Sequence, residues 1–175
     1  MELQFSAKHG EVRESIEILR GDIPSLEKSG MFYYYPFDSE SNTRSDEATR
    51  QIVVDSDHLD IDKKAVEAKI WWGNISSTVN KALVSEPNLE LRDIYRCVVT
   101  PYGPYGYFRQ PDQIFVNADH KNIEKIVETA LHEVLHLAIG DNSRGMNDRD
   151  VEATIDSLFV KALGEIFPKY KTQEF

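Results

Sequence analysis

Apolar residues recur every three or four positions over several stretches of the chain, which is the spacing of one face of a helix. The stretches that this spacing predicts to be helical are 10–20, a short turn at 23–28, and longer helices at 62–83, 121–139 and 149–167. Gly21 stands where a glycine commonly caps a helix, and Pro168 stands where the last helix should end.

Four other stretches are predicted to be strands, because β-branched and aromatic residues are concentrated in them. They are residues 31–37, 48–55, 94–100 and 113–117. The polar segment 38–46 is predicted to be a loop, and the glycine- and tyrosine-rich segment 102–109 a turn. No repeat or linker divides the chain, so these elements predict a single α+β domain over residues 1–175.

Composition and charge narrow the classes of protein that this chain can belong to. It has 175 residues with 41% hydrophobic and 29% charged side chains, which is typical of a globular protein, and a net charge of −10, which disfavours binding to nucleic acid. The single cysteine, Cys97, excludes a disulfide framework. No apolar run suits a membrane span and the N-terminus lacks a secretory pattern, so a cytoplasmic protein without a membrane partner is expected.

The helix predicted at 121–139 carries a motif with chemical meaning. Residues 132–136 read HEVLH, which is the HExxH pattern of zinc metallopeptidases. Side chains at positions i and i+4 lie on the same helix face, so His132 and His136 can bind one Zn²⁺ from one side. Glu133 is offset by one residue and can act as general base on a water beside the metal. The alternative interpretation is a solvated helix face that happens to carry two histidines.

A hydrolytic zinc site needs a third protein ligand and an open fourth position. Cys97 lies in a separate predicted strand, and positions 139 and 142 lack the glycine and histidine of the metzincin pattern. Glu152 is the candidate, because it flanks the apolar stripe of the next helix, where an unpaired carboxylate is costly. Asp156, one turn later, can hold the second ring nitrogen of a ligand histidine. The alternative for Glu152 is a salt-bridged acid at a helix start, where acidic residues are favoured.

The segments LHEVLHLAIG and VEATIDSLF together resemble the gluzincins, the thermolysin-like branch of the zincin metallopeptidases. The resemblance covers about residues 113–167. It implies His132, His136 and Glu152 as metal ligands, Glu133 as the base and Asp156 as a supporting acid. It also implies a zincin-like metal-binding core over residues 91–170, in which a small mixed sheet is followed by an active-site helix and a glutamate-bearing helix.

The resemblance leaves other parts of the chain open. The chain is far shorter than thermolysin and is closest in size to small single-domain gluzincins of prokaryotes, and residues 1–90 supply helices and strands without an assigned role. Sheets of this family present an edge strand beside the active-site helix, to which an extended substrate adds as a further strand. The candidates for that strand are 113–117 and 94–100, and the turn at 102–109 could line the cleft. The tail, 169–175, could fold back over the metal.

Stabilising a developing oxyanion requires a hydrogen-bond donor aimed at it. The sequence offers four candidates near the predicted site, each with packing or surface exposure as the alternative: Tyr105, Tyr107, Arg109 and His120.

These observations predict a zinc-dependent metalloendopeptidase that hydrolyses peptide bonds of a peptide or protein substrate. The first alternative is a zincin-fold metal-binding protein without hydrolytic activity, acting in binding or regulation. Glu133 favours the enzyme, because a binding module has no need of a base at that position. The second alternative is an unrelated interaction protein with a chance HExxH, against which the pair Glu152 and Asp156 argues.

Overall fold

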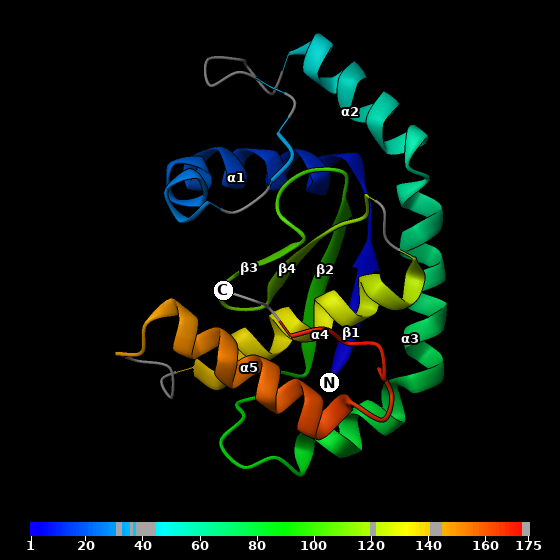
Figure 1. Cartoon of the computed structure of the whole chain (residues 1–175). Helices are drawn as coiled ribbons and strands as arrows, with labels where there is room; N and C mark the ends of the chain where they lie inside the picture. The colour runs from blue at the N-terminus through cyan, green and yellow to red at the C-terminus, as the bar shows by residue number, and fades with distance from the viewer. Residues whose placement is uncertain (31–32, 36, 38–44, 120–121, 141–144, 173–175) are drawn as a thin grey trace.

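The structure is a computed structural model of the chain, and it describes residues 1–30, 33–35, 37, 45–119, 122–140 and 145–172. Within these residues it contains five helices and a four-stranded mixed sheet, consistent with the predicted α+β class (Figure 1). In chain order the elements are β1 (Glu2–Ser6), α1 (His9–Ser29), α2 (Asp46–His58), α3 (Ile61–Val84), β2 (Ile94–Thr100), β3 (Gly106–Arg109), β4 (Gln113–Asn117), α4 (Ile123–Ile139) and α5 (Asp148–Leu163).

The strands of the sheet are arranged in the order β1-β2-β4-β3. β1, β2 and β4 are parallel, and β3 pairs with β4 in the antiparallel direction. The predictions that 94–100 and 113–117 are strands are confirmed, as β2 and β4. The prediction that either of them is the edge strand is wrong, because both are paired on two sides. The edges are β1, which the sequence analysis did not predict, and β3, which lies inside the segment predicted to be a turn.

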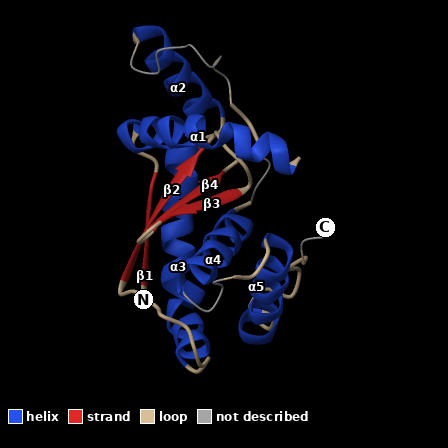
Figure 2. Cartoon of the chain, turned by 90° about the vertical axis from the view of Figure 1, so that its left-hand side faces the viewer, coloured by secondary structure: helices blue, strands red, loops and turns tan. Residues whose placement is uncertain are grey.

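Successive side chains of β3 point to opposite faces of the sheet, and they show which helices cover each face. Tyr107 donates a hydrogen bond to the carbonyl of Ser15 on α1, at 3.2 Å. The next residue, Phe108, stacks on His136 of α4. α1 and α4 therefore lie on opposite faces of the sheet, as Figure 2 shows, and α3 packs against β1, β2 and α4.

The first helix is longer than its sequence suggests. α1 continues through Gly21 and Pro24 to Ser29, and Gly30, with a φ of 69°, caps it. The predicted end at Gly21 and the separate turn at 23–28 are therefore wrong. Three core residues on one face, Val12, Ile16 and Leu19, fix this helix against the sheet.

The prediction of a strand at 48–55 is also wrong, because these residues belong to α2. The side chain of Ser45 accepts a hydrogen bond from the backbone N–H of Ala48, which is the usual cap at the start of a helix. Ala48 and Ile52, one turn apart, are buried, whereas Val54 is 59% exposed. The run of three β-branched residues resembles a strand, but burial follows the helical period.

The aromatic stretch 31–37 is described only in part, and a strand is not what the described residues form. Tyr34 makes an isolated bridge with Gly103, and its ring stacks on Tyr102. Met31, Phe32 and Pro36 lie outside the described residues, as does most of the loop predicted at 38–46.

The three C-terminal helix predictions, 62–83, 121–139 and 149–167, are confirmed as α3, α4 and α5. Their bounds shift by a few residues: α4 is described from Ile123, and α5 ends at Leu163, before a turn that leads to Pro168. None of the helices in the described part of the chain is both long and apolar enough to cross a membrane.

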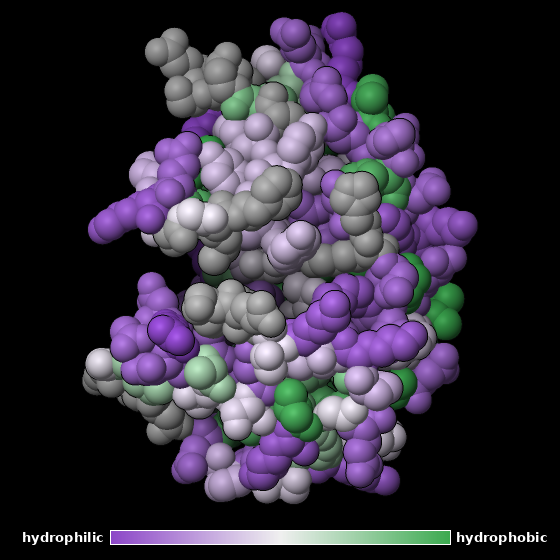
Figure 3. Space-filling model, viewed as in Figure 1, coloured by the Kyte–Doolittle hydropathy of each residue, from purple (hydrophilic) through white to green (hydrophobic). Residues whose placement is uncertain are grey.

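One hydrophobic cluster joins both halves of the chain. It contains Ile16 and Trp72 from the N-terminal half together with Val116, Leu131 and Phe159 from the C-terminal half. The face seen in Figure 3 is mostly hydrophilic, with small separate hydrophobic areas. In the N-terminal half, α1 covers one face of the sheet and β1 forms one of its edges, while α4 lies on the opposite face.

Candidate metal centre

α4 carries the HExxH motif into the interior of the protein. The helix begins at a capping residue, Asn122, whose side chain accepts a hydrogen bond from the backbone N–H of Lys125 at 2.8 Å. Apolar side chains anchor it on several sides, and His132 and Glu133 are buried with them, at 6% and 7% exposure. The polar residues of the motif are thus held by a helix that packing fixes in place.

α5 supplies the third side chain of the site. Its N-terminal cap is Asn147, which accepts from the N–H of Asp150 at 2.9 Å. Ile155 and Phe159 anchor the helix in the core, and Asp156 is buried beside them. Glu152, one turn before Asp156, projects toward α4.

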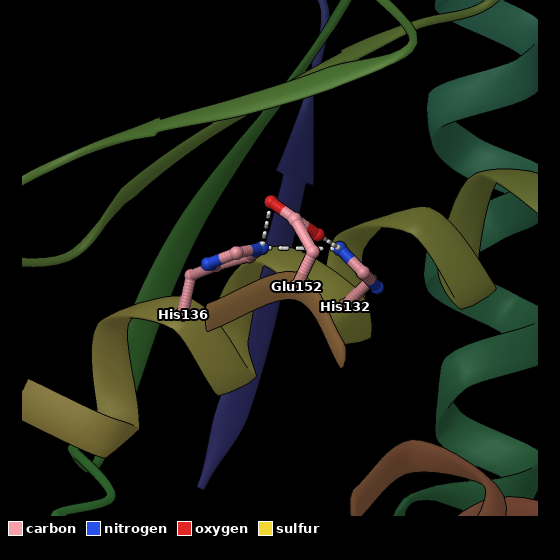
Figure 4. Close-up of side chains that lie close together, drawn as sticks. All are labelled: His132, His136 and Glu152. Carbon is pink, nitrogen blue, oxygen red and sulfur yellow. Dashed lines mark hydrogen bonds and ion pairs between the residues drawn. The ribbon is translucent and has the colours of Figure 1, made fainter. Parts of the chain in front are cut away.

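His132, His136 and Glu152 converge on one point (Figure 4). The Nε2 atoms of the two histidines are 3.1 Å apart. Nε2 of His132 lies 3.2 Å from one carboxylate oxygen of Glu152, and Nε2 of His136 lies 3.1 Å from the other. Ligands of a tetrahedral metal at about 2.0–2.1 Å lie about 3.3 Å from one another, so this geometry suits one ion. The three residues could therefore hold a metal ion, and the structure brings together the ligand set that the sequence predicts.

The charges of these groups are coupled. Burial alone would raise the pKa of Glu152, but the side chains of His132 and His136 beside its carboxylate lower that pKa to about 2. Burial opposes protonation of His136, and the hydrogen bond to Glu152 with the charges of Glu133, Glu152 and Asp156 outweighs it, so its pKa is raised. The site is electrostatically suited to a cation.

β3 runs directly over the helix that carries the motif. A Cβ atom on Gly106 would lie 2.5 Å from Oε1 of Glu133 and 2.5 Å from Cγ2 of Thr129. Two residues further along the strand, the ring of Phe108 stacks on that of His136 with centroids 5.4 Å apart. The edge strand therefore touches both the predicted base and a predicted ligand.

Asp156 reaches His132 through another residue. Its Oδ1 lies 3.9 Å from Nδ1 of His132, which is too long for a hydrogen bond. The hydroxyl of Tyr170 stands between them, 2.8 Å from Nδ1 and in hydrogen-bond contact with Asp156. The expected direct contact is thus replaced by a bridge. No periodicity or motif marks Tyr170, which lies in an irregular tail beyond Pro168.

The structure describes three of the four candidates for oxyanion stabilisation. Tyr107 lies on the opposite face of the sheet, against α1. Tyr105 and Arg109 are exposed, and His120 lies outside the described residues. The segment 102–109, which the sequence analysis expected to line the cleft, meets the cluster through Phe108, and also through Gly106, which no sequence pattern marked.

Comparison with known proteins adds no relative: no protein-family model matches the chain, and searches of curated proteins and of solved structures find no match.

Proposed function

We propose that the protein is a zinc-dependent metallopeptidase of the gluzincin type. The observation that carries the proposal is the convergence of His132, His136 and Glu152, with Glu133 next to the first of them in the chain. Two imidazole nitrogens and one carboxylate are the ligand set of hydrolytic zinc sites, in which a fourth position stays open for water.

The metal would supply Lewis acidity, lowering the pKa of a coordinated water and polarising the substrate carbonyl. Within the chain, His132, His136 and Glu152 would hold the ion, and Glu133 would accept a proton from the attacking water. Glu133 is buried, and its charge contributes to the raised pKa of His136.

The edge strand β3 is the element on which an extended peptide would bind. Among the residues that the structure describes, it pairs with β4 on one side only, so its other side could offer backbone N–H and C=O groups to a further strand. Because β3 contacts Glu133 and His136, a peptide added there would bring its backbone close to the metal-facing atoms.

The test compares the full-length protein with Glu133→Gln, which preserves shape and removes basicity. Each is loaded with zinc and incubated with a diverse peptide library. We expect the variant to retain its zinc and to lose hydrolysis by about 10²–10⁴-fold, the usual contribution of a positioned general base. Glu124→Gln, on the first turn of the same helix, is the matched control and should cleave at the wild-type rate.

Two results would contradict the proposal. If Glu133→Gln cleaves as fast as wild type, Glu133 is not the base. If zinc-loaded wild type cleaves nothing in the library, a metal-binding protein without hydrolytic activity becomes the better account of the same site.

A further inference from the structure

The C-terminal tail returns to the metal centre after α5 and places one side chain there. Figure 1 shows the tail running back across α4. The ring of Tyr170 stacks on Phe159 of α5, with centroids 4.0 Å apart and planes 12° from parallel, and the ammonium group of Lys125 lies 5.8 Å from its centroid. These contacts fix the ring between α4 and α5, so that its hydroxyl group reaches His132.

The hydroxyl group contacts the side of His132 that faces away from the other ligands. His132 turns Nε2 toward Glu152, and its other ring nitrogen points away from it (Figure 4). That second nitrogen, Nδ1, is the atom 2.8 Å from the Tyr170 hydroxyl. Through Tyr170 the tail therefore contacts the side of His132 that faces away from the other two residues of the cluster.

The direction of each hydrogen bond follows from the number of available protons. An ionised carboxylate can only accept, so Tyr170 must donate its single hydroxyl hydrogen to Asp156. Toward His132 the phenol oxygen is then left as an acceptor, and Nδ1 must carry the hydrogen.

A neutral imidazole carries one hydrogen, so protonation at Nδ1 leaves a lone pair on Nε2. That lone pair faces a carboxylate oxygen of Glu152 at 3.2 Å and Nε2 of His136 at 3.1 Å. Three electron-donating atoms converging in this way are stabilised by a cation between them.

We propose that Tyr170 is a positioning residue of the metal centre, which fixes the tautomer and ring orientation of His132 and transmits the effect of Asp156 to it. The inference rests on the proposed metal site. It adds that the tail after α5 is part of the centre, through Tyr170. Partners of this kind typically change metal affinity by 10–100-fold, although they never touch the ion.

The first test measures zinc affinity of the full-length protein by competition with a chromogenic chelator. Tyr170→Phe retains the ring that stacks on Phe159 and removes only the hydroxyl group, so we expect zinc to bind about 10–100-fold more weakly. Tyr102→Phe is the matched control. It removes a tyrosine-to-aspartate hydrogen bond of the same kind, 2.8 Å to Asp55. Neither residue belongs to α4 or α5, so this variant should bind zinc as wild type does.

The second test measures which ring nitrogen of His132 carries the hydrogen, a readout that loss of packing alone would not change. Nitrogen NMR of the metal-free protein should show His132 with its hydrogen on Nδ1 in the wild type, and loss of this preference in Tyr170→Phe. Because Asp156 acts through Tyr170, Asp156→Ala should weaken zinc binding in the wild type and have little further effect in the Tyr170→Phe background.

Unchanged zinc affinity and an unchanged tautomer in Tyr170→Phe, with wild type binding one zinc, would overturn this inference and leave the proposed function standing. Absence of peptide hydrolysis would contradict the proposed function alone, since both readouts here are binding and spectroscopic. A wild type that binds no zinc would overturn both.

Discussion

The metal-facing side chains set one another's protonation. The lowered pKa of Glu152 and the raised pKa of His136 favour an ion pair between them in the metal-free protein. A metal ion that binds here must displace the proton that they share, so its affinity should fall as the pH is lowered. The buried location of His132 and Glu133 strengthens these interactions, because water screens charges less inside the protein.

Gly106 is the residue whose small size the site most depends on. A methyl group there would lie 2.5 Å from both Thr129 and Glu133, and the Thr129 side chain is fixed by its position on a packed helix. We expect Gly106→Ala to lower the free energy of unfolding by about 1–3 kcal/mol, the usual cost of overpacking. Denaturant unfolding measures it.

Gly73→Ala is the control for that substitution. Gly73 lies inside α3, and a Cβ atom there would meet nothing within 4 Å. The same change should therefore stabilise the protein by about 0.5–1 kcal/mol, because alanine is the better helix former. If Gly106→Ala unfolds at the wild-type denaturant concentration or above it, β3 does not pass as closely over α4 as the structure shows.

At the scale of elements, the site depends on two helices that begin at asparagine caps. α4 starts after Asn122 and α5 after Asn147, and each side chain accepts a hydrogen bond from a backbone N–H of the first turn. Both helices then bury an apolar stripe against the sheet or against each other. Both helices could be predicted from the sequence, because their apolar stripes are long and the motif residues follow the same helical period.

Removing the cap of α4 should weaken the element that carries the motif. Asn122→Ala leaves the N–H of Lys125 without its side-chain acceptor, so we expect a loss of about 1 kcal/mol in the free energy of unfolding. Asn74→Ala, at an exposed interior position of α3, should be neutral or stabilising, because alanine has the higher helix propensity. Equal effects of the two substitutions in denaturant unfolding would show that the cap contributes nothing.

Other elements could not be predicted from the local pattern of apolar and polar residues. In α2, the apolar run around Val54 has the composition of a strand, and only the cap at Ser45 and burial at Ala48 and Ile52 show the helix. β3 has four residues and two of them face solvent, which leaves too short a pattern to distinguish it from a turn. β1, with five residues, is also short, and it pairs with a strand far along the chain.

At the scale of the whole molecule, the cluster of His132, His136 and Glu152 and the nearby Asp156 could be predicted from the sequence, whereas Tyr170 and Gly106 could not. His132, His136 and Glu152 follow helical spacing on two well-patterned helices, so their convergence could be inferred before the fold was known. Tyr170 reaches the site only because the tail turns back after α5, and Gly106 only because β3 is the sheet edge above α4. Contacts of this kind depend on tertiary arrangement, which local periodicity does not encode.

The measurement that tests the central claim most directly is the zinc content of the purified full-length protein, prepared without chelator beside His136→Ala, Glu152→Ala and His58→Ala. We expect about one zinc per chain in the wild type and loss of zinc in the first two variants, because each removes one of three ligands. His58→Ala, in which the removed imidazole belongs to α2, should retain it. Full zinc content in both ligand variants, or none in wild type after zinc is restored, would contradict the metal centre described here.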